Sequence, residues 1–131
     1  MAFLNGWSPQ LLSILRIMSG LLFLEHGTAK LLGIPHVTMY DAGLSPLLLA
    51  AGIIELTCGV LITAGFFTRI AAFICSGEMA VGYFLYHMRM GGFFPAVNQG
   101  DAAILFCFIF LYIAAAGPGP WSIDAKRGRT T

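Results

Sequence analysis

The stretch 11-LLSILRIMSGLLFLEHGTAKLL-32 decides the fold of this chain. It is apolar and long enough to cross a bilayer, which takes about 20 helical residues. It nevertheless carries Arg16, Glu25, His26 and Lys30. An ionisable side chain at membrane depth costs on the order of 3 kcal/mol or more unless it faces protein, water or another charge. Since four such side chains cannot all face lipid, the rest of the chain must supply an interior for them.

The composition of the whole chain indicates the same setting. Of 131 residues, 58% are hydrophobic and 10% are charged, and the mean hydropathy is +0.84. Soluble domains average roughly 45–50% apolar and about 25% charged residues. The net charge of +1 gives no basic surface for nucleic acid. We therefore expect residues 1–131 to form a single domain in the lipid bilayer of the inner (cytoplasmic) membrane, as a multi-pass protein with no nucleic-acid partner.

Three further hydrophobic segments follow the first. Ser8-Pro9 and Ser45-Pro46 are helix-start signals, and Gly33 stops the first segment. Thr68 and Asp101 are the expected caps of the last two segments. The predicted spans cover residues 10–32, 46–67, 69–88 and 102–117.

Four spans would place both termini on the same side of the membrane. The basic residues expected on that side are Arg69, Lys126, Arg127 and Arg129. Lys30 and Arg89 are the minority on the opposite side. Because cytoplasmic segments carry an excess of Lys and Arg, we predict an all-α integral membrane four-helix bundle with cytoplasmic N- and C-termini.

Intramembrane polar residues converge in this topology. Glu55 shares its helix face with Gly52 and Gly59, and small residues let another helix approach closely. Glu78 lies on a similar face of the next span. The remaining polar residues of the outer half are Glu25, His26, Lys30, His87, Arg89, Asn98 and Asp101. We expect one outward-opening cavity, with Arg16 as an exception that needs a separate partner in the inner half.

The glycine-rich connection RMGGFFPAVNQG (89–100) is expected to lie at the membrane interface or to fold back as a lid. A carboxylate and an imidazole beneath such an outward-facing lid are suited to a quinone head group. The candidate catalytic residues, as proton carriers or hydrogen-bonding groups, are Glu25, His26, Glu55 and Glu78. The candidate ligand-binding residues are Lys30, His87, Arg89, Asn98 and Asp101. The alternative is that these charges pair with one another and fix the register of the helices.

The sequence offers little for a metal. Cys58, Cys75 and Cys107 are isolated within apolar runs, and we interpret them as small buried hydrophobic residues rather than ligands. His26 and Lys30 do not form a zinc motif of the His-Glu-x-x-His type. Haem ligation by His26 and His87 is a weaker alternative, because it requires them on opposite sides of one cavity. We expect no metal site.

Several segments in order resemble a known family. They are residues 11–32, GIIELTCGVLITAGFFTRIAA (52–72), His87, and GGFFPAVNQGDAAILFCFIFLYIAAAGPGPWSID (91–124). Together they resemble the successive motifs of the DoxX family of small bacterial and archaeal membrane proteins. The matching single positions include Arg16, Gly20, His26, Gly27, Lys30, Glu55, Gly59, Arg69, His87 and Asn98. The family commonly has Asn-Gly-Gly-Glu where this chain has Gln99 and Asp101, and Asp keeps the charge but shortens its reach.

The resemblance implies a four-helix membrane protein associated with redox work. DoxD-type relatives are subunits of a thiosulfate:quinone oxidoreductase, and some DoxX proteins are anchors for soluble redox and sulfur-transfer enzymes. We expect a component of an oxidoreductase system, in redox homeostasis or sulfur-compound oxidation, with a quinone as its small partner. Whether the chain is itself an enzyme stays open. The alternatives are a non-catalytic anchor for such soluble proteins and a small transporter, which would have to form a homo-oligomer.

Overall fold

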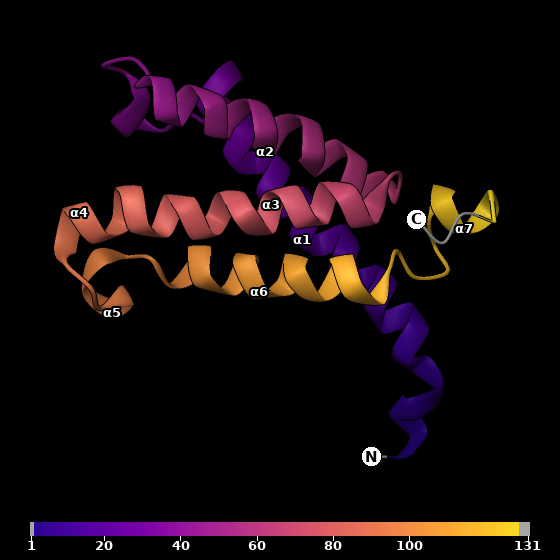
Figure 1. The fold of residues 1–131 in the computed structure, drawn as a ribbon. Helices are drawn as coiled ribbons and strands as arrows, with labels where there is room; N and C mark the ends of the chain where they lie inside the picture. Colours follow the sequence, from indigo (N-terminus) through magenta and orange to yellow (C-terminus); the bar gives the residue numbers. More distant parts are fainter. Residues whose placement is uncertain (1, 129–131) are drawn as a thin grey trace.

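The structure, a computed structural model, describes residues 2–128, and every regular element in that range is helical (Figure 1). The long helices are α1 (Ser8–Leu32), α2 (Pro46–Ala64), α3 (Thr68–Gly82) and α6 (Asp101–Ala116). The short ones are η1 (Ala2–Trp7), η2 (Thr38–Tyr40), η3 (Tyr83–His87), α4 (Met88–Gly91), α5 (Pro95–Asn98) and α7 (Ile123–Lys126). The predicted all-α class is confirmed.

Local signals explain where α1 ends and α2 begins. Gly33 adopts a left-handed conformation (φ 67°) directly after α1, which suits a residue without a Cβ. The Ser45 hydroxyl accepts a hydrogen bond from the Leu48 N–H (3.3 Å), so it caps α2 as predicted. The expected cap at Ser8 is wrong, because η1 leads directly into α1 and no side chain caps that start.

The expected caps at Thr68 and Asp101 are also wrong. Thr68 is the first residue of α3, and its N–H and hydroxyl donate to the Asp124 carboxylate at 2.9 and 2.8 Å. The Phe67 N–H donates to the same carboxylate at 3.1 Å. Asp101 begins α6 after Gly100 without a side-chain cap. The cap of α3 thus comes from the end of the chain, which no local pattern reveals.

The third hydrophobic segment is longer than α3 alone. The helix continues through η3, a π-helical turn, and α4, so residues 68–91 form one interrupted helix. A π-turn inserts an extra residue and is frequent at functional sites. The π-turn lies between α3 and α4, near the end of the molecule that holds α4 and α5.

The long helices pack as two pairs, α1 with α2 and α3 with α6 (Figure 1). The pairs meet mainly through α2 and α3, whereas α1 and α6 have little contact. The buried core at their junction consists of Phe23, Cys58, Ile62, Ala71, Ala72, Cys75, Phe110 and Ile113. This arrangement leaves space between the pairs on the side away from the core.

Glycines bring α1 and α2 unusually close. A Cβ on Gly27 would lie 2.5 Å from the backbone N of Leu56, and a Cβ on Gly59 would lie 2.8 Å from Cα of Leu24. Both distances are too short for any side chain. The prediction that small residues beside Glu55 admit another helix is therefore confirmed, and that helix is α1.

The partner that Arg16 requires is a set of backbone carbonyls. Its fully buried guanidinium donates to Ile62 O (2.5 Å) and Thr63 O (2.7 Å) at the end of α2. It also donates to Pro118 O (2.7 Å) and Trp121 O (2.5 Å) in the segment after α6. A cation at a helix C-terminus is favourable because it meets unpaired carbonyls and the negative end of the dipole.

Arg69 has the same relation to the other helix pair. Arg69 lies near the start of α3, and its guanidinium donates to Ala114 O (2.8 Å) and Ala115 O (2.5 Å) at the end of α6. In each pair of helices, an arginine on the first helix thus donates hydrogen bonds to carbonyls in the last turn of the second helix.

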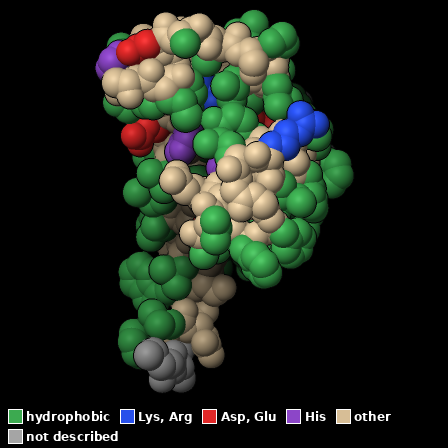
Figure 2. Space-filling view, turned by 90° about the vertical axis from the view of Figure 1, so that its left-hand side faces the viewer, with side chains coloured by type: hydrophobic (Ala, Val, Ile, Leu, Met, Phe, Trp, Pro, Cys, Tyr) green, Lys and Arg blue, Asp and Glu red, His purple; other side chains and the backbone are tan. Residues whose placement is uncertain are grey.

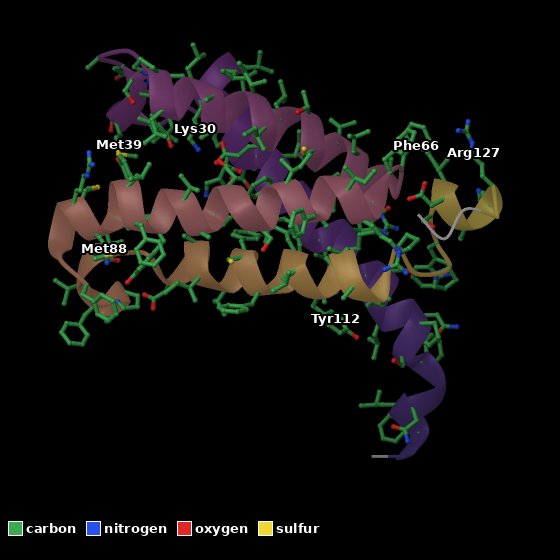
Figure 3. All side chains as sticks on the ribbon, viewed as in Figure 1. Lys30, Met39, Phe66, Met88, Tyr112 and Arg127 are labelled. Carbon is green, nitrogen blue, oxygen red and sulfur yellow. The ribbon has the colours of Figure 1, made fainter. Side chains whose placement is uncertain are left out.

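The outside of the molecule is apolar. Large hydrophobic side chains are exposed along every long helix, including Met18, Ile53, Phe73 and Phe108. Figure 3 shows one further example, Tyr112, which projects outward from α6. By length and composition, the helical stretches Phe3–Leu32 and Pro46–Ala64 could each cross a membrane, and α6 is apolar but shorter. These surfaces are suited to lipid.

Candidate functional site

A cavity of about 480 Å³ lies between the two helix pairs. Its walls come from α1, η2 and α2 on one side and from α3, η3 and α6 on the other, and they are mostly apolar. Figure 2 views the molecule from the end where α4 and α5 lie and shows histidine side chains recessed between its upper and lower parts. The cavity has the size and character of small-molecule sites, roughly 300–1,000 Å³ and mainly hydrophobic.

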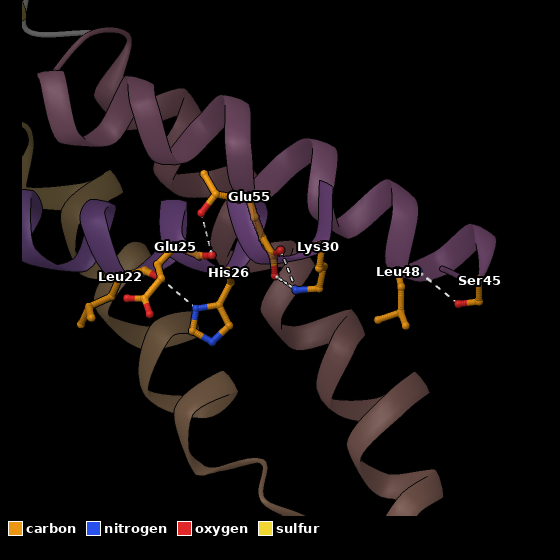
Figure 4. A network of polar contacts seen from close by, with 8 residues as sticks. Leu22, Glu25, His26, Lys30, Ser45, Leu48 and Glu55 are labelled. Carbon is orange, nitrogen blue, oxygen red and sulfur yellow. Dashed lines mark hydrogen bonds and ion pairs between the residues drawn. The ribbon is translucent and has the colours of Figure 1, made fainter. Parts of the chain in front are cut away.

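One wall carries a buried ion pair. Lys30 Nζ on α1 lies 2.7 and 2.6 Å from the two carboxylate oxygens of Glu55 on α2 (Figure 4). The side chains are only 7% and 4% exposed. Close approach of the helices at Gly27 and Gly52 brings the two charges together. Lys30 Nζ also lies 5.7 Å from the ring centre of Tyr40, which adds a cation–π contact.

Glu78 borders the cavity from the facing helix, α3. Its Oε2 is buried and has no hydrogen-bond partner among residues 2–128. Buried polar atoms are nearly always hydrogen-bonded, and an unpaired one costs about 1–3 kcal/mol. Glu78 therefore presents acceptor capacity that the described protein atoms do not satisfy.

Two histidines on the cavity wall, His26 and His87, each direct Nδ1 at a backbone carbonyl. Nδ1 of His26 lies 2.8 Å from Leu22 O, and Nδ1 of His87 lies 3.1 Å from Asn98 O. A carbonyl can only accept, so Nδ1 is the donor in both contacts. Nε2 of each ring is left for other interactions, as an acceptor in the neutral ring or a donor in the charged one.

Five of the predicted site residues meet at this cavity: His26, Lys30, Glu55, Glu78 and His87. The cavity therefore offers donors on α1 and η3 and an acceptor on α3. Within residues 2–128, no group of three or more His, Cys, Asp or Glu side chains could hold a metal ion.

The other four predicted residues do not line the cavity. Glu25 is exposed and points away from Lys30, since adjacent helical residues differ by about 100° (Figure 4). Arg89 and Asp101 are exposed. Asn98 is buried and organises the α4–α6 connection.

The contacts of Asn98 explain its burial. Its Nδ2 donates to Gly92 O (2.7 Å), and its Oδ1 accepts from the Gly100 N–H (2.8 Å). Its carbonyl receives His87 Nδ1. Asn98 thus orients a cavity residue through the backbone instead of facing the cavity.

Sequence reasoning missed residues at the rim. Tyr40, Tyr86, Met39 and Gln99 all line the cavity. The Tyr86 hydroxyl contacts Met39 Sδ at 3.3 Å, which joins η3 to η2 across the opening. The connection that holds Met39 and Tyr40 has no periodicity that could have shown the direction of their side chains.

Known proteins are similar to this chain over most of its length. The family model described as DoxX matches residues 11–88, a range that contains all five cavity residues predicted from the sequence. An uncharacterized protein of Haemophilus influenzae is 42% identical over 127 residues, which cover 94% of this chain and 95% of the relative. The inner membrane protein YphA of Escherichia coli is 32% identical over 127 residues, with 90% and 91% covered.

A more distant relative is the uncharacterized membrane protein Rv3486 of Mycobacterium tuberculosis. It is 29% identical over 147 residues, which cover 94% of this chain and 85% of that protein. No solved structure matches the chain significantly.

Proposed function

Because the chain belongs to the DoxX family and is a multi-pass inner-membrane protein, we propose that it is a quinone-binding component of a membrane oxidoreductase system. The observation that carries the proposal is the mainly apolar cavity, where the Lys30–Glu55 pair faces the unpartnered carboxylate of Glu78. Redox homeostasis and sulfur-compound oxidation are the processes that the family resemblance suggests.

The cavity can bind a quinone through both apolar and polar contacts. The ring would pack on side chains such as Phe106 and Ile54, and a quinone oxygen would accept a hydrogen bond from Lys30 or from an imidazole. Leu47 and Val81 line the cavity and are also exposed, which gives an isoprenoid tail a way out toward lipid.

Proton exchange is the role of the carboxylates. A quinone takes up two electrons and two protons when it becomes a quinol. Glu78 Oε2 is positioned to accept a hydrogen bond from a quinol hydroxyl, and the Nε2 atoms of His26 and His87 can hold or release a proton. The oxidised ring would therefore be held mainly by donors and the reduced ring by Glu78.

We also propose that four segments cross the membrane and that both termini are cytoplasmic. The support is the distribution of charge in the structure. Arg16, Arg69, Lys126 and Arg127 gather at the end that holds the C-terminal segment, and the cavity lies toward the opposite end. The cavity would then open toward the outer face.

Photolabelling tests the quinone site. Protein in lipid nanodiscs is labelled with an azidoquinone in competition with a short-chain ubiquinone or the corresponding ubiquinol, and labelled peptides are mapped by mass spectrometry. We expect competed labelling of peptides from α1, α2 and η3. Glu78→Gln should weaken competition by the ubiquinol about tenfold or more, because the quinol hydroxyl loses a carboxylate acceptor and a hydrogen bond to a charged group contributes about 1.5–3 kcal/mol.

Glu25→Gln is the matched control, since it neutralises a nearby glutamate outside the cavity. It should bind the quinone as the wild type does. Labelling that a short-chain quinone does not displace, or equal competition by the ubiquinol in both variants, would refute the proposal.

One observation favours the non-catalytic anchor as a second candidate. Lys30 and Glu55 form a close bidentate pair with each other, as a pair that only fixes helix register would. An anchor predicts that Glu78→Gln alters stability and that neither the ubiquinone nor the ubiquinol competes with labelling, so the same experiment separates the two functions.

A further inference from the structure

The cavity has a side that faces lipid, between α2 and α3. Each of these helices contributes one face to the cavity wall, and the two faces include Leu47, Ala50, Ala51 and Ile54 on α2, and Ile74, Gly77, Glu78 and Val81 on α3. Both sets have the spacing i, i+3, i+4, i+7 of a single helix face. Leu47, Ile74 and Val81 are nevertheless 40%, 44% and 50% exposed. Wall residues that are also exposed form the edges of an opening, which we call the α2–α3 window.

Small residues lie in the middle of each edge of the window. Ala50 on α2 and Gly77 on α3 are both exposed, and larger residues lie about one turn to either side of them. Apart from the backbone of its own helix, nothing lies within 4 Å of a Cβ built on Gly77. Leu47 and Ile54 are seven residues apart, which makes the α2 edge about 10 Å long. The α2–α3 window therefore has room for a hydrocarbon chain at its centre.

Side-chain contacts cross the cavity in two other places. At the end that holds η2 and η3, the Tyr86 hydroxyl contacts Met39 Sδ at 3.3 Å. Between α1 and α6, the centre of the Phe106 ring lies 5.7 Å from that of Phe23 and 6.3 Å from that of His26. A chain that leaves the cavity through the α2–α3 window meets neither of these contacts.

The window adjoins a polar group of the cavity. Glu78 follows Gly77 directly on the α3 edge, and its buried Oε2 has no hydrogen-bond partner among residues 2–128. A ligand with a polar ring at Glu78 and a hydrocarbon chain beside Gly77 would match both features. A long hydrocarbon chain keeps such a ligand in the bilayer, because each buried methylene favours the membrane. The ligand therefore arrives from the side and not from water.

We propose that the α2–α3 window makes the cavity selective for long-tailed quinones. The ring enters sideways from the bilayer, and the first part of the isoprenoid tail stays in the window beside Gly77. Gly77 sets this preference, because a large side chain at that position would occupy the space of the tail. The inference rests on the proposed quinone site, and it names the class of quinone that the site takes.

Competition by two ubiquinones tests the window. Labelling by a tail-less azidoquinone in nanodiscs is competed with a long-chain ubiquinone or with a ubiquinone that has no isoprenoid tail. Gly77→Phe should weaken competition by the long-chain ubiquinone about tenfold or more, because the added ring meets the tail. Competition by the tail-less ubiquinone should change by less than about twofold. Each ubiquinone is compared between variant and wild type, so differences in partitioning into lipid cancel.

Two variants serve as controls for Gly77→Phe. Gly77→Ala adds only a Cβ, which has open space around it. Ile70→Phe places the same ring on α3 at a position that is 58% exposed and outside the cavity wall. Both should match the wild type with both ubiquinones, and thermal unfolding checks that every variant is folded. If Gly77→Phe weakens both ubiquinones equally, or leaves the long-chain one unchanged, the window does not select the tail.

Labelling from the tail gives a second test that needs no variant. A ubiquinone with a diazirine on its first isoprene unit should label wild-type peptides that contain residues 47–54 and 74–81. Labels confined to α1 and α6 would overturn the window and leave the quinone site standing. If neither ubiquinone displaces the azidoquinone from the wild type, the proposed function and the window both fall.

Discussion

Lys30 and Glu55 show how a single pair makes a charged helix compatible with a membrane. The two charges neutralise each other across a short bidentate contact that is almost completely buried. A buried pair of this kind need not add net stability, but removing one partner leaves an uncompensated charge in a low-dielectric interior. The pair is therefore a sensitive point of the fold.

A double-mutant cycle tests this sensitivity. Glu55→Gln should lower the free energy of unfolding by about 3–5 kcal/mol, because Lys30 is left buried and unpaired. The double variant Lys30→Met/Glu55→Leu should recover most of that loss, since it removes both charges. SDS titration of the detergent-solubilised protein measures each value.

The exposed pair His36–Asp41 is the control for this cycle. Its side chains are 67% and 58% exposed, although the contact is also short at 2.8 Å. His36→Ala should change stability by less than about 1 kcal/mol, as exposed pairs do. If Glu55→Gln is as mild as His36→Ala, the buried pair does not have the role described.

Most of the helices could be predicted from the sequence, but several of their ends could not. Runs of apolar residues between Pro and Gly signals predicted the long helices, and Ser45 and Gly33 mark ends as expected because their interactions are local. The cap of α3 was missed because Asp124 acts on Thr68 from 56 residues away. Sequence periodicity also cannot show the π-turn at η3, which changes the directions of Tyr86 and His87.

The same distinction applies to the site. His26 and Lys30 share a helical face by their spacing of four, and small neighbours indicated that Glu55 points inward, so these residues could be predicted. Glu25 was included for its charge and its depth along the first helix, and its direction excludes it from the cavity wall. The rim tyrosine Tyr40 depends on how the connection after α1 folds back, which only tertiary structure determines.

Close contact between α1 and α2 predicts a steric effect. Gly27→Ala should destabilise the protein by about 1–3 kcal/mol or more, because its Cβ would meet the Leu56 backbone and force the helices apart. Gly77→Ala is the matched control within a helix, since no atom lies within 4 Å of the Cβ it would add. Its stability should be unchanged or slightly higher, by up to about 1 kcal/mol.

Thermal unfolding of both glycine variants in the same detergent measures the difference. Equal melting temperatures would contradict the interpretation that helix separation at Gly27 is limited by backbone contact.

At the scale of the whole molecule, two arginine-closed helix pairs enclose a cavity between them. Arg16 and Arg69 hold one end of each pair, while η2, η3 and the α4–α6 connection surround the other end. One end of the molecule is thus held together by the two arginines, and the other end carries the polar cavity. Because the two ends differ, the orientation of the molecule in the membrane decides which side the cavity faces.

Reporter fusions test the orientation. Green fluorescent protein, which fluoresces only when it folds in the cytoplasm, should fluoresce when fused after residue 131. Alkaline phosphatase, which is active only outside the cytoplasm, should be active when fused after Gly43 or Gly92 and inactive when fused after Gly65. The opposite pattern would place the cavity toward the cytoplasm and contradict the proposed topology.

The hydrogen bonds of Arg16 to the segment after α6 also determine when during synthesis its contacts can form. Arg16 and its acceptors Pro118 and Trp121 are 102 and 105 residues apart in sequence. A ribosome needs on the order of 5–20 s to make that interval. Throughout that time the guanidinium in the nascent α1–α2 hairpin lacks half of its acceptors, so the environment of Arg16 is complete only after the segment that follows α6 has been made.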